Sequence, residues 1–169
     1  PVLGLARTFS HEMQARCPGL LSQIEIDLGD AAALGNWLAG SALRHYLAGD
    51  NAILLINNAG VVQPVGTLLD QDVPGVARAV TLNIAAPMML SAAVVAHSAG
   101  AERRILHISS GAGRNAYPGW SVYCATKAAL DQHARAVSLD AVPGVRISRA
   151  AARRALPQPT KYGTRRPCP

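Results

Sequence analysis

Short runs of consecutive apolar residues recur along the chain and predict buried strands. Each run is about as long as a strand and ends in polar or glycine-rich residues: 2–6, 24–28, 52–56 and 105–108. Strands that lack polar alternation are typically buried on both faces, as they are in parallel sheets. A further strand is predicted over residues 145–148.

Segments with helical spacing separate these runs. The pattern predicts a helix over residues 30–47, a long helix that begins at Asp70 or Asp72 and ends near residue 97, and a helix over residues 121–142. Strands that alternate with helices are typical of a doubly wound parallel sheet. The predicted fold class is therefore α/β.

The regular pattern ends after Ser148. Residues 149–169 contain arginine pairs and scattered prolines and have no apolar period. One interpretation is a disordered basic tail. Another is a sequence that has left its proper reading frame, because a shifted GC-rich frame tends to encode alanine, arginine and proline. Both alternatives stay open, and the predicted domain comprises residues 1–148.

Positive charge gathers at the end of the chain. The net charge is +6, yet residues 1–145 hold nine basic and ten acidic side chains, whereas residues 146–169 hold seven basic and no acidic ones. A body close to neutrality favours a protein that acts on small molecules. A nucleic-acid binder is the alternative, and it is disfavoured because the basic residues lie in one irregular segment.

The composition indicates one packed domain in a reducing compartment. Half of the 169 residues are apolar and 15% are charged. The three cysteines form no C-x-x-C motif and the five histidines show no ligand spacing, so we expect neither disulfides nor a metal site. The most apolar stretch, 79–96, is interrupted by Asn83 and Pro87, and no signal sequence is visible. We therefore expect a cytoplasmic protein with no membrane partner.

Three side chains offer acid–base chemistry. Tyr123 and Lys127 lie four residues apart on a predicted helix, so both point to one face. An ammonium group beside a phenol lowers the phenol pKa from about 10, which suits Tyr123 to general acid–base catalysis. Ser110 ends a predicted strand, where side chains of open α/β sheets face a ligand crevice. The alternatives are an ordinary exposed helix face and a serine-rich turn.

Two further segments carry weaker signals. Pro87 has no N–H to donate to the Asn83 carbonyl, so we expect a kink and a free carbonyl that binds water on a proton path toward Lys127. A kink that serves packing alone is the alternative. The sequence N-N-A-G at residues 57–60 follows a predicted strand, and its small residues permit a ligand to approach the backbone closely.

These four features together resemble the short-chain dehydrogenase/reductase family. They occur in the family's order, with Ser110 twenty-seven residues after Asn83 and thirteen before Tyr123. The resemblance covers residues 2–148. It implies a Rossmann-like fold and hydride transfer between a nicotinamide cofactor and a carbonyl or alcohol.

The resemblance assigns catalytic roles to four residues. Tyr123 is the implied acid–base and Ser110 the implied group that orients the substrate oxygen. Lys127 is expected to lower the tyrosine pKa and to hold the nicotinamide ribose, and Asn83 to support the proton relay. The implied cofactor-binding residues are Arg7, Asp27, Leu28, Asn58, Ala59, Gly60, Tyr123 and Lys127.

The resemblance also narrows cofactor and substrate. Arg7 stands where members that prefer NADPH place a basic residue, so NADP(H) is expected over NAD(H). The segment G-W-S-V-Y-C at residues 119–124 is similar to the sepiapterin reductase and benzil reductase branch, which reduces vicinal dicarbonyls. The two long predicted helices pack across subunits in this family, which implies a homodimer or homotetramer if the fold is complete. A non-catalytic remnant or interaction subunit is the alternative function.

One glycine-rich segment is interpreted as unrelated to phosphate binding. Gly111–Gly113 begins a G-x-G-x-x-A match after a predicted strand. A phosphate-binding loop must open directly into a helix, and residues 117–119 interrupt that here. We interpret the segment as a loop on the substrate side.

The family's first strand and its T-G-x-x-x-G-x-G loop have no counterpart in this sequence, nor does its C-terminal Pro-Gly segment. The chain is therefore expected to be a fragment with an incomplete sheet. The strands at residues 2–6 and 52–56 would lose a shared neighbour and expose unpaired backbone groups. We expect such a chain to be unstable or prone to aggregate and to bind dinucleotide poorly.

Overall fold

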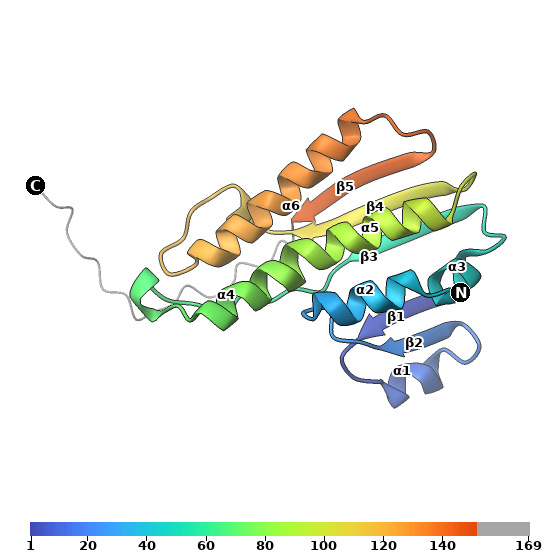
Figure 1. The fold of residues 1–169 in the computed structure, drawn as a ribbon, viewed down its shortest axis with the longest axis horizontal. Helices are drawn as coiled ribbons and strands as arrows, with labels where there is room; N and C mark the ends of the chain where they lie inside the picture. The colour runs from blue at the N-terminus through green and yellow to red at the C-terminus, as the bar shows by residue number, and fades with distance from the viewer. Residues whose placement is uncertain (152–169) are drawn as a thin grey trace, which may run out of the picture.

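Five parallel strands form two separate sheets in the computed structural model, which describes residues 1–151 (Figure 1). One sheet pairs β1 (Val2–Ala6) with β2 (Leu21–Glu25), and the other has the order β3 (Ala52–Asn57), β4 (Glu102–Ser109) and β5 (Val145–Ala151). The predicted α/β class with parallel strands is confirmed.

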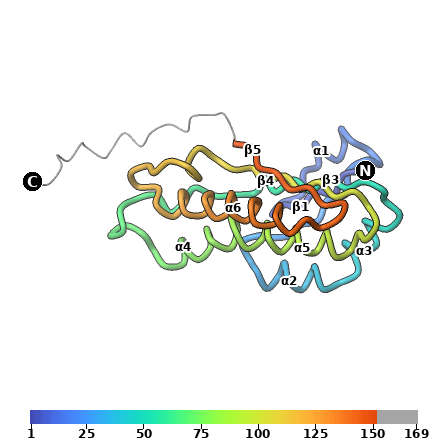
Figure 2. Tube along the Cα trace, turned by 90° about the horizontal axis from the view of Figure 1, so that it is seen from above, coloured from blue at the N-terminus to red at the C-terminus, as the bar shows by residue number. Residues whose placement is uncertain are grey.

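Helices cover mainly one side of these strands. Figure 2 shows α2, α4, α5 and α6 on the same side, while α1 lies toward the other. The helices are α1 (His11–Arg16), α2 (Ala31–Ala39), α3 (Ala42–Leu47), α4 (Val73–Val80), α5 (Ala86–His97) and α6 (Ser121–Leu139). Short turns complete the list: η1 (Leu68–Asp70), the π-helical turn η2 (Thr81–Ala85) and η3 (Gly111–Gly113).

The two sheets are held together by helices rather than by backbone hydrogen bonds. Among the described residues, β1 pairs only with β2, and β3 only with β4. Leu3 from β1 and Ile53 from β3 nevertheless pack on the same buried cluster of Leu43, Leu47 and Val94. This separation is the gap that the sequence predicts between these two strands.

The side of β3 turned away from that cluster carries uncovered apolar surface. Leu54 is 61% exposed and Ile56 is 51% exposed. Strand edges with unpaired backbone groups favour association with other chains, and contiguous apolar surface adds to that tendency. Both features favour association with other chains, and the expected instability or aggregation stays a prediction.

Several elements differ in extent from their predictions. β2 lies three residues earlier than expected because polar Gln23 is satisfied within the strand, where its side chain pairs with the backbone N–H and C=O of Ser10. The predicted helix 30–47 is two helices, since Gly40 adopts an extended conformation between them. The short helix α1, capped by the Ser10 hydroxyl, was not predicted.

The third helix and the last strand also end at other residues than expected. α6 ends at Leu139, three residues before the predicted end, and β5 continues to Ala151, three residues beyond Ser148. Most of the predicted basic tail, residues 152–169, lies outside the described residues.

The long helix is interrupted where the sequence predicts a kink. At η2 the N–H of Ala86 donates to the carbonyl of Thr81, five residues earlier, which is π-helical geometry. Pro87 follows at the first turn of α5, where its missing N–H is tolerated.

The combined helical segment Val73–His97 corrects one expectation. Its 25 residues are long and apolar enough to cross a membrane by length and composition, although the sequence pattern had suggested that no segment was. Ala79, Ala86, Leu90 and Val94 lie buried on this segment, and three of them belong to the clusters that cover the sheets. Core packing accounts for part of its apolar character, since 39% of its most apolar window is buried.

Arg103 lies near the amino end of β4, at the edge of the three-stranded sheet opposite the carboxyl ends of its strands; we call the sheet of β3, β4 and β5 the main sheet. Its side chain lies on β4 and the residue is 6% exposed. Nη1 donates to the carbonyls of Ser98 at 2.9 Å and Ala101 at 2.6 Å, and Nη2 donates to the carbonyl of Pro143 at 2.9 Å. One guanidinium therefore joins the end of α5 to the turn before β5.

Candidate active site

The candidate catalytic groups gather at the carboxyl ends of β3 and β4. Asn57 ends β3 and pairs in register with His107, so both strands finish at the same edge. Ser110 follows β4 directly, and α6 packs against β4, β5 and η3. The topology therefore brings the N-N-A-G loop, Ser110 and the helix with Tyr123 to one side of the molecule.

Ser110 caps the turn η3. Its Oγ accepts the N–H of Ala112 at 3.2 Å. The turn lies close to α6, because a Cβ atom added at Gly113 would lie 3.0 Å from the carbonyl oxygen of Lys127 and 3.2 Å from Oδ2 of Asp131. Gly111–Gly113 is thus a 3₁₀ turn packed on a helix and does not open an α-helix.

Tyr123 lies in the first turns of α6 and is 8% exposed. Its ring meets Trp120 edge-on, with centroids 5.7 Å apart and planes at 87°. Ala112 of the Ser110 loop belongs to the same buried cluster. The phenol is therefore held in an apolar wall beside that loop and is largely shielded from bulk water.

Lys127 lies one turn further along the same face of α6. Its Nζ is 5.7 Å from the centroid of the Tyr123 ring and donates to the carbonyl of Ile108 on β4 at 2.8 Å. The residue is 5% exposed, and burial lowers the pKa of the ammonium, while the charge of Asp131 acts in the opposite direction. The predicted shared face of Tyr123 and Lys127 is present.

Asn83 joins three parts of the site through its side chain. Oδ1 accepts the N–H of Val61 at 2.8 Å, and Nδ2 donates to the carbonyl of Val61 at 2.8 Å and to Oγ1 of Thr126 at 3.0 Å. The sequence argument concerned only the main-chain carbonyl of Asn83. The side chain instead ties the loop after N-N-A-G to α6.

Gly60 brings the N-N-A-G loop against these groups. A Cβ atom at Gly60 would lie 3.2 Å from Oδ1 of Asn83 and 3.5 Å from Nζ of Lys127. Asn58, Ala59 and Gly60 are exposed to solvent, so their backbone is open to a ligand. The glycine thus lets the loop lie close to two candidate catalytic residues, and the close approach of a ligand stays a prediction.

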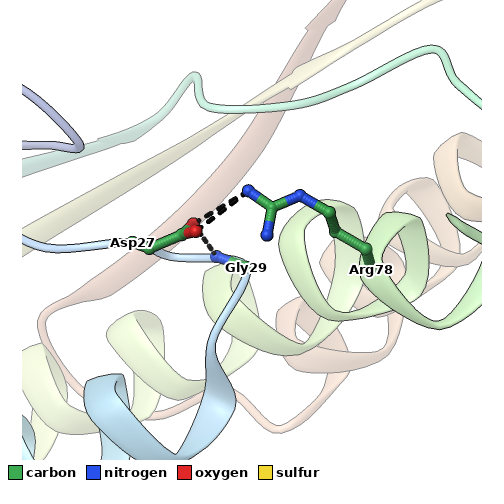
Figure 3. Close-up of polar contacts among 3 residues, drawn as sticks. All are labelled: Asp27, Gly29 and Arg78. Atoms are coloured by element: carbon green, nitrogen blue, oxygen red, sulfur yellow. Dashed lines mark hydrogen bonds and ion pairs between the residues drawn. The ribbon is translucent and has the colours of Figure 1, made fainter. Parts of the chain in front are cut away.

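A second group of predicted residues lies near the carboxyl ends of β1 and β2. The Asp27 carboxylate accepts the N–H of Gly29 at 2.8 Å and forms an ion pair with Arg78 of α4 (Figure 3). The Gly29 N–H lowers the pKa of Asp27, and the charges of Arg78 and Arg7 lower it further. Leu28 is packed in the core with its side chain, so only its backbone is available to a ligand.

A buried chain of polar groups escaped the sequence argument. Nδ2 of Asn57 lies 3.1 Å from Nδ1 of His107 and 3.3 Å from Oγ of Ser91, and Nε2 of His107 lies 3.1 Å from Nδ1 of His133 on α6. An amide nitrogen donates, so Nδ1 of His107 accepts and its Nε2 donates to His133. One signal in the sequence could have revealed these groups: His107 is a polar residue within the apolar run 105–108.

From these buried polar groups, we expect the protein to lose stability in acid. His107 is fully buried, and burial, together with the charges of His133 and Lys127, lowers its pKa to about 4, against a partial opposing effect of Asp131. The unfolded chain binds a proton near pH 6.5, before the folded one does, so stability falls between about pH 6.5 and 4 by up to about 3 kcal/mol.

Urea unfolding at several pH values measures this loss. In the variant His107→Gln, the free energy of unfolding is expected to depend less steeply on pH over the same range. Part of the dependence remains, because burial also lowers the pKa of His133. A wild-type stability that stays constant from pH 6.5 to 4 would contradict the prediction.

One hollow beside α6 lies away from these groups. A cavity of about 330 Å³ is open to solvent between α6 and β5, and its lining includes Ala134, Ser138, Leu139 and Ile147. Ala134, Ser138 and Leu139 follow Tyr123 by about three turns or more along α6, so the cavity is not the candidate site. Within residues 1–151, no group of three or more potential metal ligands is found.

Comparison with known proteins gives matches over most of the described residues. A family model described as short chain dehydrogenase matches residues 6–153. The chain is 36% identical over 94 residues to benzil reductase ((S)-benzoin forming) of Bacillus cereus, covering 54% of this chain and 38% of that protein. It is 30% identical over 147 residues to sepiapterin reductase of Meriones unguiculatus, covering 83% of this chain and 56% of that protein.

A solved structure is similar over more of its length. The crystal structure of a short-chain dehydrogenase/reductase from Burkholderia vietnamiensis superposes with a TM-score of 0.88 and 55% identity, covering 90% of this chain and 71% of that chain. The chain spans only about two fifths of the length of the benzil reductase that it matches.

Proposed function

The chain belongs to the short chain dehydrogenase family, and we propose that it serves the NADPH-dependent reduction of small carbonyl compounds. The observation that carries this proposal is the convergence of Gly60, Asn83 and Lys127 beside the helix face that holds Tyr123. That convergence joins residues from three separate segments of the chain, and an ordinary exposed helix face would not require it.

Tyr123 is the proposed proton donor to the carbonyl oxygen. Its phenol is shielded from bulk water, which strengthens the effect of a nearby charge. The Lys127 ammonium, 5.7 Å from the ring centroid, stabilises the negative charge that develops when the phenol gives up its proton. Ser110 orients the carbonyl oxygen by donating its hydroxyl hydrogen.

The residues present fit a nicotinamide cofactor. An ammonium has three N–H groups, and among the described residues Lys127 uses one of them, on Ile108, so two can bind ribose hydroxyls. The absence of a side chain at Gly60 lets the loop lie against Asn83 and Lys127, and the exposed backbone of residues 58–60 is open to a flat ligand. When bound, the cofactor supplies the hydride that reduces the carbonyl carbon.

The preference for NADPH rests on charge at the other end of the site. Arg7 follows β1, is exposed, and lies near enough to Asp27 to lower its pKa. An arginine in this position suits the 2′-phosphate of NADPH. The similarity to benzil reductase and sepiapterin reductase supports vicinal dicarbonyls as substrates.

Localisation and assembly belong to the same proposal. We propose a cytoplasmic protein, since its cysteines are few and the described ones are free, and a homodimer or homotetramer in which the long helical segment Val73–His97 and α6 meet a second copy. Val73 is 82% exposed and Val80 is 41% exposed on that segment, which leaves apolar surface for such contact.

A second candidate is a non-catalytic protein of the same fold. The two separate sheets, with the unpaired edges of β1 and β3, favour it because the cofactor site would span both sheets. The two candidates differ in turnover.

Absorbance at 340 nm distinguishes them. With benzil and NADPH, the reductase proposal expects oxidation of NADPH that exceeds the rate with NADH at equal concentration. A folded chain that binds NADPH but oxidises none with benzil or with a simple ketone supports the non-catalytic alternative, and a folded chain that binds neither nucleotide overturns the proposed function.

A further inference from the structure

The ion pair of Asp27 and Arg78 joins segments 51 residues apart. Asp27 lies between β2 and α2, and Arg78 lies on α4. Nη2 of Arg78 donates to both carboxylate oxygens, at 2.9 Å to Oδ2 and 3.2 Å to Oδ1, and the N–H of Gly29 donates to Oδ1 (Figure 3). The carboxylate is therefore held from two directions.

Gly29 makes room for this arrangement. A Cβ atom there would lie 3.0 Å from both Cζ and Nη1 of Arg78 and 3.1 Å from Oδ1 of Asp27. The guanidinium thus lies close against the Gly29 backbone. The φ of Gly29 is not positive, so alanine is compatible with the backbone and would act by displacing Arg78.

The pair is accessible and keeps spare hydrogen-bonding capacity. The side chains of Arg78 and Asp27 are 43% and 36% exposed. Oδ2 of Asp27 accepts one hydrogen bond among the described residues, whereas a carboxylate oxygen can accept about two. A donor from a ligand can therefore bind Asp27 while Arg78 stays in place.

We propose that Arg78 is a positioning residue for adenine recognition. It holds the Asp27 carboxylate so that the free acceptor site takes the exocyclic amino group of the purine. A carboxylate fixed before the ligand arrives loses less conformational freedom on binding, which raises affinity. This inference rests on the proposed function and on the resemblance to the family, which implies that Asp27 contacts the adenine of the cofactor.

Calorimetric titration of the full chain tests the proposal with two probes. Adenosine 2′,5′-bisphosphate carries the adenine half of NADPH, and reduced nicotinamide mononucleotide carries the other half. Arg78→Ala and Gly29→Ala are each expected to bind the bisphosphate about tenfold more weakly. In both variants Arg78 no longer holds the Asp27 carboxylate in place, and its charge-assisted hydrogen bond with the adenine amino group is lost. Their affinity for the mononucleotide is expected to stay unchanged. The control Arg44→Ala removes an exposed arginine of α3 and is expected to bind both probes as the wild type does.

Each outcome decides a different claim. Equal affinity of wild type and Arg78→Ala for the bisphosphate would overturn the role of Arg78 and leave the proposed function standing. Parallel losses for both probes would overturn it as well, since they indicate a general structural effect. A wild-type chain that binds NADPH but not the bisphosphate would also overturn the role of Arg78. A wild-type chain that binds none of the three nucleotides overturns the proposed function itself.

Discussion

Replacing Tyr123 with phenylalanine is expected to lower kcat for ketone reduction about a thousandfold, within the range attributed to a positioned acid or base. The substitution removes one oxygen and keeps the ring, which packs edge-on against Trp120 with centroids 5.7 Å apart. The wall of the site therefore persists, and the affinity for NADPH is expected to stay within about twofold. The fall in rate reports the lost proton donor.

Tyr46→Phe is the matched control for this experiment. Tyr46 lies on α3, half-buried beside the cluster of Leu43 and Leu47, and removal of its hydroxyl should leave kcat unchanged. Initial rates of NADPH oxidation with benzil measure both variants. If Tyr123→Phe retained the wild-type rate, Tyr123 would not be the proton donor, even if the chain proved to be a reductase.

The variant Arg103→Met is expected to lower the free energy of unfolding by about 3–5 kcal/mol. The charged guanidinium loses three hydrogen bonds, to the carbonyls of Ser98, Ala101 and Pro143, and a hydrogen bond to a charged group contributes about 1.5–3 kcal/mol. The Ser98 carbonyl keeps the N–H of Ala101 as a donor, which limits the loss. Methionine fills part of the volume but donates no hydrogen bond. The end of α5 and the turn before β5 then lose their connection.

Arg104→Met supplies the comparison. Arg104 is the next residue on β4 but points to the opposite face and is exposed, so its replacement should change stability by less than about 0.5 kcal/mol. Urea unfolding monitored by tryptophan fluorescence measures both, through Trp37 and Trp120. Equal midpoints for the two variants would contradict the structural role of Arg103.

Two of the three buried charged residues in the described part of the chain, Arg103 on β4 and Lys127 on α6, show where sequence patterns fall short. Arg103 occupies an inward position of β4, and Lys127 an inward position of α6, although arginine and lysine are rarely buried. Each is tolerated because backbone carbonyls accept its hydrogens. The carbonyls that accept from Arg103 lie in the turns before β4 and β5, and the one that accepts from Lys127 lies on β4, so hydrophobic patterning alone could not reveal them.

The candidate site also combines residues that the sequence predicts with contacts that it does not predict. Spacing alone placed Tyr123 and Lys127 on one helix face, since a helix repeats every 3.6 residues, and it placed Ser110 at a strand end. The hydrogen bonds of the Asn83 side chain to Val61 and Thr126 depend on how η2 packs against a loop and against α6. No local rule predicts that packing.

By itself, the amino-acid sequence determined the alternation of strands and helices, the parallel class of the sheet and the helix irregularity near Pro87, because each depends on short-range periodicity and backbone chemistry. The tertiary structure alone decided the pairing of Asp27 with Arg78, the buried chain from Asn57 to His133 and the burial of Arg103. These contacts join positions far apart in the chain, and only the arrangement of packed elements in space brings their atoms within bonding distance.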